Sequence, residues 1–438
     1  KQQATQDNMA DTASYYTRNL INTYTQIDQA TGAVNYIVPV GNILSTNDTY
    51  TQSYNFRAQL NFSHQWANSG LDAIAGWEVR QVDVQSSGNT FYGYSTDPLT
   101  YESVDPVNRY PKFTGGSGTI PGGASLTHTL NRFVSIYANA AYNWQQRYIL
   151  SASIRKDASN IFGVSTNNKW SPLWSMGAAW NISKERFYHS SFLPYLKLSA
   201  TYGYSGNVDL SVSALPVERL VAPDYYYSYY TYARVGTLNN PSLRWEKTNM
   251  LNAGIDFRMV ADIISGSIEY YHKKGTDLYG PSNYDYTTFG LTDQITKNVA
   301  DMSGNGMDVQ LRSLNINRSV RWTTELIFDY NTGKITRYYS PEGNIFTATY
   351  GTSISPMVGK PVYALLSYKW GGLATQGNQQ GYLNGQLSTD YNDIINAATS
   401  PDSLMYDGQA LPKYFGSLIS TVSWKGLSLT AGIGYELG

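Results

Sequence analysis

The sequence contains no cysteine and little charge. Among its 438 residues there is no Cys, which excludes disulfide frameworks, thiolate nucleophiles and thiolate metal sites. Charged residues make up 14% of the chain, against roughly 25% in soluble domains. The 31 basic and 32 acidic residues give a net charge of -1 and are scattered. Because nucleic-acid binding needs clustered Lys and Arg, we expect no nucleic-acid partner.

Long hydrophobic runs are also missing. No apolar run approaches the ~18 residues of a transmembrane helix, so a membrane location would require a closed β-barrel. Residues 1–11 are polar and lack a basic region followed by an apolar one, so we expect no signal peptide in this chain. The length fits either several soluble domains or one large barrel.

Strict alternation of apolar and polar residues is the clearest pattern that is present. Over residues 54–66, Tyr, Phe, Ala, Leu, Phe, His and Trp occupy every second position, and the residues between them are all polar. This run exceeds an ordinary strand of about 5–6 residues. It suffices for a tilted strand across a bilayer, which needs about 9–11. The pattern therefore predicts a membrane-crossing strand.

The alternation recurs along the chain, and short and long connections follow one another. Residues 67–70 and 145–147 are predicted turns, whereas residues 85–127 and 205–243 are predicted long loops. Roughly a dozen strands or slightly more are predicted, among them residues 54–66, 71–79, 134–144, 148–154, 174–182, 196–204, 251–257, 264–272, 307–311, 322–330, 415–423 and 427–435.

These features favour one fold class. Outer-membrane barrels combine tight periplasmic turns, long extracellular loops and aromatic residues at both membrane borders. Several aromatic residues here are placed near predicted strand ends: Trp66, Trp77, Trp144, Trp180, Tyr202, Tyr204 and Trp322. We therefore predict an all-β fold, a transmembrane antiparallel β-barrel with short periplasmic turns and long extracellular loops. A soluble sandwich or propeller is the alternative, although its strands would be shorter.

Several segments resemble the SusC/RagA family of TonB-dependent transporters, in that family's order. Residues 155–163 (RKDASNIFG) resemble its R-x-D-x-S-x-x-F-G segment. Residues 170–183 (WSPLWSMGAAWNIS) resemble its W-x-x-F-P-S-x-x-x-A-W-x-I-S strand. Residues 196–207 (LKLSATYGYSGN) and 240–257 (NPSLRWEKTNMLNAGIDF) resemble its L-K-x-R-x-S-x-G-x-x-G-N and N-P-x-L-x-W-E strands. Together these segments span more than a hundred residues of the chain.

Two further segments extend the resemblance toward the C-terminus. Residues 298–311 (NVADMSGNGMDVQL) resemble the family's N-x-x-x-x-x-N-x-G-x-E-x-x-L hairpin, with Asp308 in place of the usual Glu. Residues 412–435 resemble its P-K-Y-x-G strand pair. The resemblance implies a 22-stranded barrel, of which residues 1–438 would form a little more than half. It also implies that the plug domain, the signal peptide and the last strands are not in this chain.

The resemblance further implies a function. Family members are outer-membrane importers of oligosaccharides or peptides. They work with a SusD-like lipoprotein as an extracellular lid, are energised by TonB through the plug, and form dimers of transporter–lid pairs. The expected surroundings are outer-membrane lipid, with no cofactor. The choice between glycan and peptide stays open, with tyrosine-rich loops slightly favouring glycans.

Two sets of residues are candidates for function. The polar positions opposite the apolar wall should line the lumen, namely Arg57, Gln59, Asn61, Ser151, Ser153 and Arg155. The loop at residues 210–240 holds a cluster whose rings and hydroxyls suit sugars or a lid protein, namely Tyr225, Tyr226, Tyr227, Tyr229, Tyr230 and Tyr232. The alternative is that these tyrosines only pack the loop against its neighbours.

No catalytic or metal-binding constellation stands out. The four His residues lie far apart, and His64 and His272 fall on apolar strand faces. The loop acids lack the tight spacing of a calcium loop, namely Asp390, Asp393, Asp402 and Asp407. We therefore expect a protein that is not an enzyme. The rival functions are a porin without a plug or an outer-membrane enzyme, and, less favoured, a soluble all-β glycan-binding protein.

Overall fold

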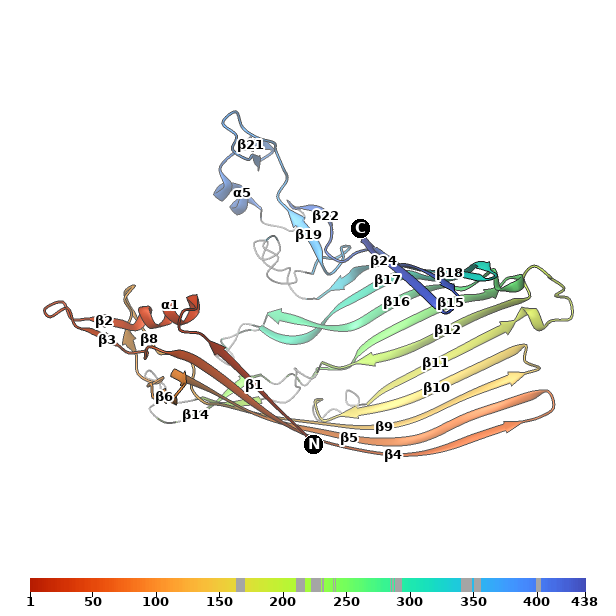
Figure 1. The fold of residues 1–438 in the computed structure, drawn as a ribbon, viewed down its shortest axis with the longest axis horizontal. Coiled ribbons are helices and arrows are strands. Elements are labelled where there is room, and N and C mark those ends of the chain that lie inside the picture. Colours follow the sequence, from red (N-terminus) through yellow and green to blue (C-terminus); the bar gives the residue numbers. More distant parts are fainter. Residues whose placement is uncertain are drawn as a thin grey trace.

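The computed structural model describes residues 1–162, 170–209, 217–221, 232–238, 242–283, 294–339, 356–398 and 403–438, with residues 230, 240, 285, 287 and 349. Most of them lie in one sheet of 14 strands (Figure 1). The all-β, antiparallel prediction is confirmed. In order across the sheet the strands are β1 (Gln2–Ala10), β4 (Asn42–Gln65), β5 (Ser69–Thr96), β9 (Ser125–Trp144), β10 (Tyr148–Ser159), β11 (Trp170–Asn181), β12 (Tyr195–Asn207), β15 (Glu246–Arg258), β16 (Ile264–Asn283), β17 (Gln294–Asn317), β18 (Val320–Tyr338), β23 (Tyr414–Trp424) and β24 (Leu427–Leu437), while β6 (Leu99–Glu102) pairs with β5.

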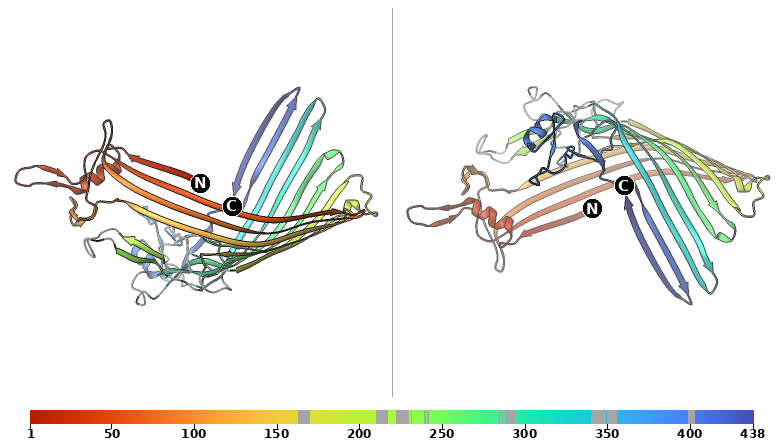
Figure 2. Two further views of the ribbon diagram at one scale, coloured as in Figure 1. Left: turned by 90° about the horizontal axis from the view of Figure 1, so that it is seen from below. Right: turned by 90° about the horizontal axis from the view of Figure 1, so that it is seen from above.

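The sheet is strongly curved. In Figure 2 the strands β4, β5 and β9 form one wall, and β18, β23 and β24 rise at an angle to it, so that the sheet is a trough. Neighbouring strands in a sheet are rotated by about 20–25° relative to one another because of the right-handed twist of each strand. Accumulated over this many strands, that rotation curls the sheet in the way a barrel wall requires.

Most connections are short at one end of the strands and long at the other, and the 13-residue connection 182–194 is the exception. At one end of the strands the hairpins close over residues 66–68, 145–147, 182–194, 259–263, 318–319 and 425–426. At the other end the connections cover residues 11–41, 97–124, 160–169, 208–245, 284–293 and 339–413. The predicted separation into a tight end and an elaborate end is confirmed, and the second is called the long-loop end below.

Two of the tight hairpins use left-handed backbone. Gln145 and Gln146 have φ values of 54° and 57°, and the Arg147 N–H donates to Trp144 O at 3.0 Å. Two central residues with positive φ make a type I′ turn, whose twist matches that of the flanking strands. Between β23 and β24, Lys425 and Gly426 repeat this arrangement with φ values of 46° and 87°.

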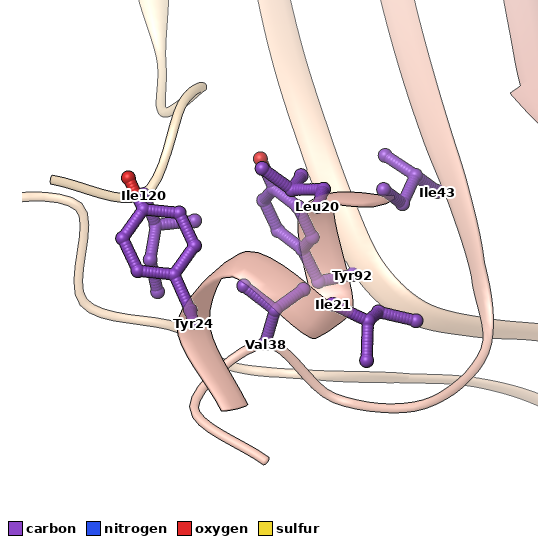
Figure 3. Close-up of a cluster of buried hydrophobic side chains, with 7 residues drawn as sticks. All are labelled: Leu20, Ile21, Tyr24, Val38, Ile43, Tyr92 and Ile120. Atoms are coloured by element: carbon purple, nitrogen blue, oxygen red, sulfur yellow. The ribbon is translucent and has the colours of Figure 1, made fainter. Parts of the chain in front are cut away.

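The longest strands end in a small packed unit at the long-loop end (Figure 3). We call it the α1 knob: residues 11–41, which include α1 (Tyr15–Tyr24), β2 (Thr25–Ile27) and β3 (Val34–Tyr36), together with residues 97–124. Ser14 caps α1 by accepting from the Thr17 N–H at 3.2 Å. The buried core under the helix consists of Leu20, Ile21, Tyr24, Val38, Ile43, Tyr92 and Ile120. Each such side chain contributes about 1.5–3 kcal/mol on burial, so the knob is anchored to β4 and β5.

Several smaller elements lie at the same end of the trough. They are β7 (Tyr110–Pro111) with β8 (Ser117–Gly118), β13 (Val217–Val221) with β14 (Tyr232–Thr237), β19 (Ala364–Ser367) with β22 (Met405–Gln409), β20 (Gly381–Leu383) with β21 (Gln386–Ser388), and α5 (Tyr391–Ala397). At the opposite end are the 3-10 turns η1 (Ile182–Lys184) and η2 (Val260–Asp262). Within the described ranges, no helix has the length and apolar character needed to span a membrane.

Strand lengths are where the sequence prediction was wrong. The loop expected from residue 85 to 127 begins only after Thr96, and β9 already starts at Ser125. Likewise β4 starts at Asn42, before the alternation that begins at Tyr54. Beyond the apolar band both faces of a strand meet a polar environment, so alternation disappears although the ladder continues. The loop predicted over residues 205–243 similarly contains the β13–β14 hairpin.

Candidate transport surface

One face of the sheet is an apolar band. Directly opposed residues of antiparallel strands project to the same side, and the register places Ala140 opposite Ala152 and Ala152 opposite Met176. On this face Leu60, Leu150 and Met176 are 79%, 58% and 62% exposed. Soluble monomers rarely expose contiguous apolar patches beyond a few hundred Å². The band is therefore suited to lipid rather than to water.

Aromatic side chains border the band at both edges. Near the short turns the ring of Tyr148 stacks with Trp144 and with Trp180, at centroid distances of 5.6 and 6.4 Å. Toward the long-loop end the ring of Trp174 lies 5.7 Å from that of Tyr202. Trp and Tyr are enriched at membrane–water interfaces because each has an apolar body and a polar tip. The predicted girdles are thus present at both borders of the band.

The opposite face carries a charged network in β4, β5, β9 and β10. Arg57 Nη2 lies 2.6 Å from Glu78 Oε2, and the register continues from Glu78 to Ser135 and on to Asp157. Arg155 donates to Asp157 Oδ1 at 2.7 Å and to Ser135 Oγ at 2.8 Å. Two of the residues predicted to line the lumen, Arg57 and Arg155, therefore belong to one row of charged and polar side chains across these strands.

Tyr137 lies at the centre of this network. Its hydroxyl donates to Gln59 Oε1 at 2.8 Å, and the guanidinium carbons of Arg57 and Arg155 both lie 5.8 Å from its ring centroid. The ring occupies the space that a side chain at Gly76 would need, since a Cβ there would be 2.7 Å from the Tyr137 hydroxyl. The ring thus holds Gln59 and both arginines in place on the polar face.

The remaining predicted lumen residues share this face. Asn61 Oδ1 accepts from Gln59 Nε2 at 2.6 Å, and Ser153 Oγ lies 2.9 Å from Ser175 Oγ. Ser151 lies two residues from Ser153 along the same strand, and so on the same side. The structure thus places all six residues on one polar face, while the lining of a lumen stays a prediction.

Farther across the trough the polar face becomes acidic. Glu269 is paired with Asp308, and Asp308 with Asp329, so three carboxylates lie side by side on β16, β17 and β18. Asn252 Nδ2 donates to Glu269 Oε2 at 3.0 Å. We call Glu269, Asp308 and Asp329 the acidic row.

At the long-loop end, four of the segments that carry the family resemblance meet in one place. Phe162, from residues 155–163, stacks on Trp245, from residues 240–257, with ring centroids 5.3 Å apart. Leu243 completes this core, and Phe162 and Leu243 are each only 1% exposed. We call these residues, with the hydrogen-bonded side chains described next, the rim cluster.

Glu246 and its partners tie β12, β15 and β16 together in the rim cluster. Its Oε2 accepts from Asn207 Nδ2 at 3.0 Å, and its Oε1 accepts from the Tyr279 N–H at 2.8 Å. The Tyr279 hydroxyl donates to Arg244 O at 2.8 Å. Burial raises the pKa of Tyr279 well above its ordinary value, so this phenol remains a proton donor.

Asn298 and Arg244 close the cluster on the β17 side. The Arg244 N–H donates to Asn298 Oδ1 at 3.1 Å, and Asn298 Nδ2 donates to Arg244 O at 2.8 Å. Arg244 Nη2 lies 2.5 Å from Asp277 Oδ1, and this hydrogen bond raises the pKa of the guanidinium. Asn240 Nδ2 donates to Thr296 O at 2.8 Å. The conspicuous polar residues of these segments thus satisfy backbone groups, which is a structural role.

The tyrosine-rich loop is described only in part. Tyr225, Tyr226, Tyr227 and Tyr229 lie outside the described residues. Tyr230 is 81% exposed, and Tyr232 begins β14, where it pairs with Val221 of β13. The assignment of these six tyrosines to substrate or lid contact stays a prediction.

Histidines and acids have ordinary partners where they are described. His64 lies on the apolar face with its ring 4.5 Å from that of Trp66, and His272 Nδ1 lies 2.6 Å from Asn305 Oδ1. Asp390 caps α5 by accepting from the Asp393 N–H at 3.1 Å. Over the part of the chain with described positions, no three His, Asp or Glu residues group in a way that could hold a metal ion.

Sequence reasoning missed Glu78, Tyr137 and the contacts of the rim cluster. Glu78 and Tyr137 break no pattern, because each occupies an ordinary polar-face position, and only the register brings them beside Arg57 and Arg155. For the rim cluster a signal existed, since Trp245 and Asn298 stand inside the segments that resemble the family. Their meeting in space requires the three-dimensional arrangement.

Comparison with known proteins agrees with this geometry. The family model "TonB dependent receptor-like, beta-barrel" matches residues 2–435. TonB-dependent receptor P3 of Formosa agariphila is 26% identical over 306 residues, covering 68% of this chain and 28% of that protein. TonB-dependent receptor SusC of Bacteroides thetaiotaomicron is 25% identical over 333 residues, covering 66% of this chain and 33% of SusC. The aligned regions thus span about a third of the length of these relatives.

Solved structures give the same fold. The structure of the RagAB peptide transporter superposes with a TM-score of 0.71 at 21% identity, covering 90% of this chain and 42% of that one. Proteins of this family reside in the bacterial outer membrane, which fits the apolar band and its aromatic borders. The chain therefore belongs to the TonB-dependent receptor family, with SusC-like proteins among its relatives, and forms part of the family's transmembrane β-barrel.

Proposed function

We propose that this chain is part of the barrel of a TonB-dependent importer that takes up oligosaccharides or peptides through the outer membrane. The observation that carries the proposal is the two-faced sheet: an apolar band with aromatic borders on one side and a hydrogen-bonded polar face on the other. Such a sheet encloses a polar path inside a lipid-facing wall. In this proposal Arg57, Gln59, Asn61, Ser151, Ser153 and Arg155 line that path.

The proposed energy source and partners come from the relatives. SusC is a TonB-dependent receptor, and RagAB is a peptide transporter. By analogy, TonB acts on a plug inside the barrel, and a SusD-like lipoprotein covers the long-loop end, with transporter–lid pairs forming dimers. Residues 1–438 are in this proposal a partial barrel, and the plug and remaining strands belong to other parts of the protein. In this proposal the six tyrosines of residues 225–232 contact the substrate or the lid.

Two alternatives differ in what they require. A porin without a plug or an outer-membrane enzyme would share the two-faced sheet but would need no TonB. The family model that matches residues 2–435 describes TonB-dependent receptors, which favours the importer. A soluble glycan-binding protein is incompatible with the exposure of Leu60 and Met176 to water.

The test uses the full-length protein in its native outer membrane. Purification followed by mass spectrometry should recover a SusD-like lipoprotein in stoichiometric amount. Growth on the imported nutrient should stop when TonB is deleted. A protein that stays in the membrane fraction, lacks a lipoprotein partner and supports uptake without TonB would establish the porin instead.

A further inference from the structure

A cavity of about 360 Å³ lies against the polar face of β15–β18 at the long-loop end. Its volume falls within the range of small-molecule sites, about 300–1,000 Å³. The position on the polar face follows from the register, which runs without interruption from Ser153 through Ser175, Gly203 and Met250 to Lys273. The cavity therefore opens on the same side as the residues proposed to line the transport path.

The roof of the cavity is a returning loop that is fixed to β18. Pro361, Val362, Tyr363, Leu411 and Pro412 supply it. Backbone hydrogen bonds hold this loop: the Ile335 N–H donates to Lys360 O at 2.9 Å, the Gly359 N–H to Ile335 O at 2.8 Å, and the Asn331 N–H to Lys413 O at 2.9 Å. The roof is thus part of the sheet's hydrogen-bonding pattern, and the cavity beneath it is pre-formed.

Three glycines leave part of the cavity floor without side chains. Gly304 and Gly333 are directly paired, and Gly275 lies on the neighbouring strand. A Cβ added at Gly333 would meet only backbone atoms, at 3.6 and 3.9 Å, so space for a side chain exists there but is left open. A ligand can therefore approach the backbone closely.

Among the residues with described positions, one cation and a few polar groups line this mostly apolar space. Lys273 is paired with Gly304 in the floor, and its Nζ lies 4.3 Å from the centroid of the Tyr271 ring. Thr248, Asn331 and Gln409 add hydrogen-bonding groups, and Leu278 and Met302 add apolar surface. A single ammonium beside apolar walls selects a ligand with one anionic group on an apolar body.

The acidic row also acts on Lys273. The Lys273 ammonium and the Asp308 carboxylate attract each other, and the ammonium lies over the ring of Tyr271, two residues nearer to Glu269. An anion in the cavity therefore competes with Asp308 for Lys273, and the carboxylates oppose the movement of that anion farther along the polar face.

We infer that this cavity binds the carboxylate end of a small ligand, with Lys273 contacting the carboxylate and the roof covering its apolar part. A peptide C-terminus with an apolar side chain has this chemistry. A uronic acid shares the carboxylate but not the apolar body, and both fall within the substrate classes of the proposed function. The inference rests on that function in one respect, since the ligand reaches the cavity through the transport path.

Calorimetry on the purified full-length protein in lipid nanodiscs tests the site. The probes are an acetylated tripeptide ending in leucine, the same peptide with an amidated C-terminus, and a glucuronate-terminated trisaccharide. The free-acid peptide or the trisaccharide should bind, and the one that binds identifies whether the site takes a peptide or a glycan. The amidated peptide should bind at least about tenfold more weakly than the free-acid peptide. Binding of neither acid, or equal binding of acid and amide, would overturn the site.

Two variants and one matched control sharpen the result. Lys273→Gln should lower the affinity for the acid to that for the amide, and Gly333→Leu should weaken both by filling the floor. Lys274→Gln removes the same charge from the neighbouring residue, whose side chain is on the opposite face, and should bind like wild type. Equal affinities of Lys273→Gln and Lys274→Gln for the acid contradict the site. If the wild-type protein binds the acid as expected but supports no TonB-dependent uptake, only the proposed function is contradicted.

Discussion

Glycines on the polar face give space to tyrosine rings from neighbouring strands. Tyr137 lies over Gly76, and Tyr271 lies over Gly306, where an added Cβ would be 2.0 Å from the Tyr271 Cζ. Filling the gap above a strand glycine with a cross-strand aromatic ring stabilises a sheet that would otherwise lose side-chain packing. In both pairs a tyrosine ring therefore packs flat against the backbone of the neighbouring strand at its glycine.

Gly306→Ala should therefore destabilise the barrel. The new methyl group overlaps the buried Tyr271 ring, and overpacking of this kind costs about 1–3 kcal/mol. Urea unfolding of the full-length protein in vesicles, followed by the gel shift of the folded form, measures the change. Gly432→Ala is the control, because its Cβ would make ordinary contact at 3.7 Å with Ile419. Equal midpoints for the two variants would contradict this account of Tyr271.

Tyr92 makes the α1 knob sensitive to alkali. It is 1% exposed and donates a hydrogen bond to Pro121 O, and burial raises its pKa to about 12, against about 10 in an unfolded chain. A raised acid pKa means that the knob is fully stabilised below pH 10 and loses stability as pH rises from 10 to 12. Proteolysis within residues 11–41 should accelerate in that window.

The comparison that isolates Tyr92 uses two phenylalanine variants. Tyr92→Phe should abolish the alkaline step, although its cleavage at neutral pH is faster because a hydrogen bond is lost. Tyr101→Phe, at a tyrosine that is 59% exposed, should keep the step. A step that persists in Tyr92→Phe would assign it to another tyrosine.

At the scale of elements, the rim cluster fixes where the long loops leave the strands. Asn298 accepts from the Arg244 N–H and donates to Arg244 O and Asp277 O, on two other segments. Arg244 O also accepts from the Tyr279 hydroxyl, so removing Asn298 leaves the Arg244 N–H and Asp277 O without this partner, and an unpaired group costs about 1–3 kcal/mol where it is shielded from water. The Asn298 amide therefore helps to fix the connection between β12 and β15.

Asn298→Ala should therefore loosen the rim while leaving the wall intact. We expect faster proteolysis within residues 208–245, and uptake reduced several-fold at equal surface amounts. Asn315→Ala is the control: Asn315 also makes side-chain hydrogen bonds, to Ser313 and Thr324, but it lies near the short turns. Similar proteolysis of both variants would show that the rim does not govern these loops.

The sequence predicted strands well where lipid meets one face and poorly elsewhere. Each of the twelve segments predicted from alternation overlaps a strand of the sheet, because a residue that faces lipid must be apolar and its neighbour need not be. At residues 85–96 that constraint ends, so the last part of β5 shows no alternation of apolar and polar residues in the sequence. The α1 helix was missed because its apolar face covers only a small core. Lys273 was missed because its cavity is formed by a loop distant in sequence.

At the scale of the whole molecule, adjacent residues face opposite environments. Ala152 lies in the apolar band, and Ser151 next to it lies on the polar face. A charge placed in lipid costs about 2–4 kcal/mol near the bilayer midplane of a barrel, while a charge on a hydrated face costs little. The two positions therefore test which side of the wall faces the lumen.

Ala152→Lys should lower the fraction of folded barrel and its unfolding free energy by about 2–4 kcal/mol. Ser151→Lys should leave both nearly unchanged and alter uptake instead. Both variants add one lysine to the same strand, so they control for each other. A larger loss for Ser151→Lys would reverse the assignment of the two faces, and with it the predicted lumen residues.

The length of β4 and β5 has a consequence for macromolecules that approach the barrel. From Val79 to Thr96 the strand spans roughly 58 Å at ~3.4 Å per residue, nearly twice the ~30 Å thickness of the hydrocarbon core. The extension of β4 and β5, flanked by β1 and by the start of β9, carries the α1 knob at its far end. A macromolecule that arrives at the long-loop end therefore meets the knob several nanometres before it reaches the apolar band.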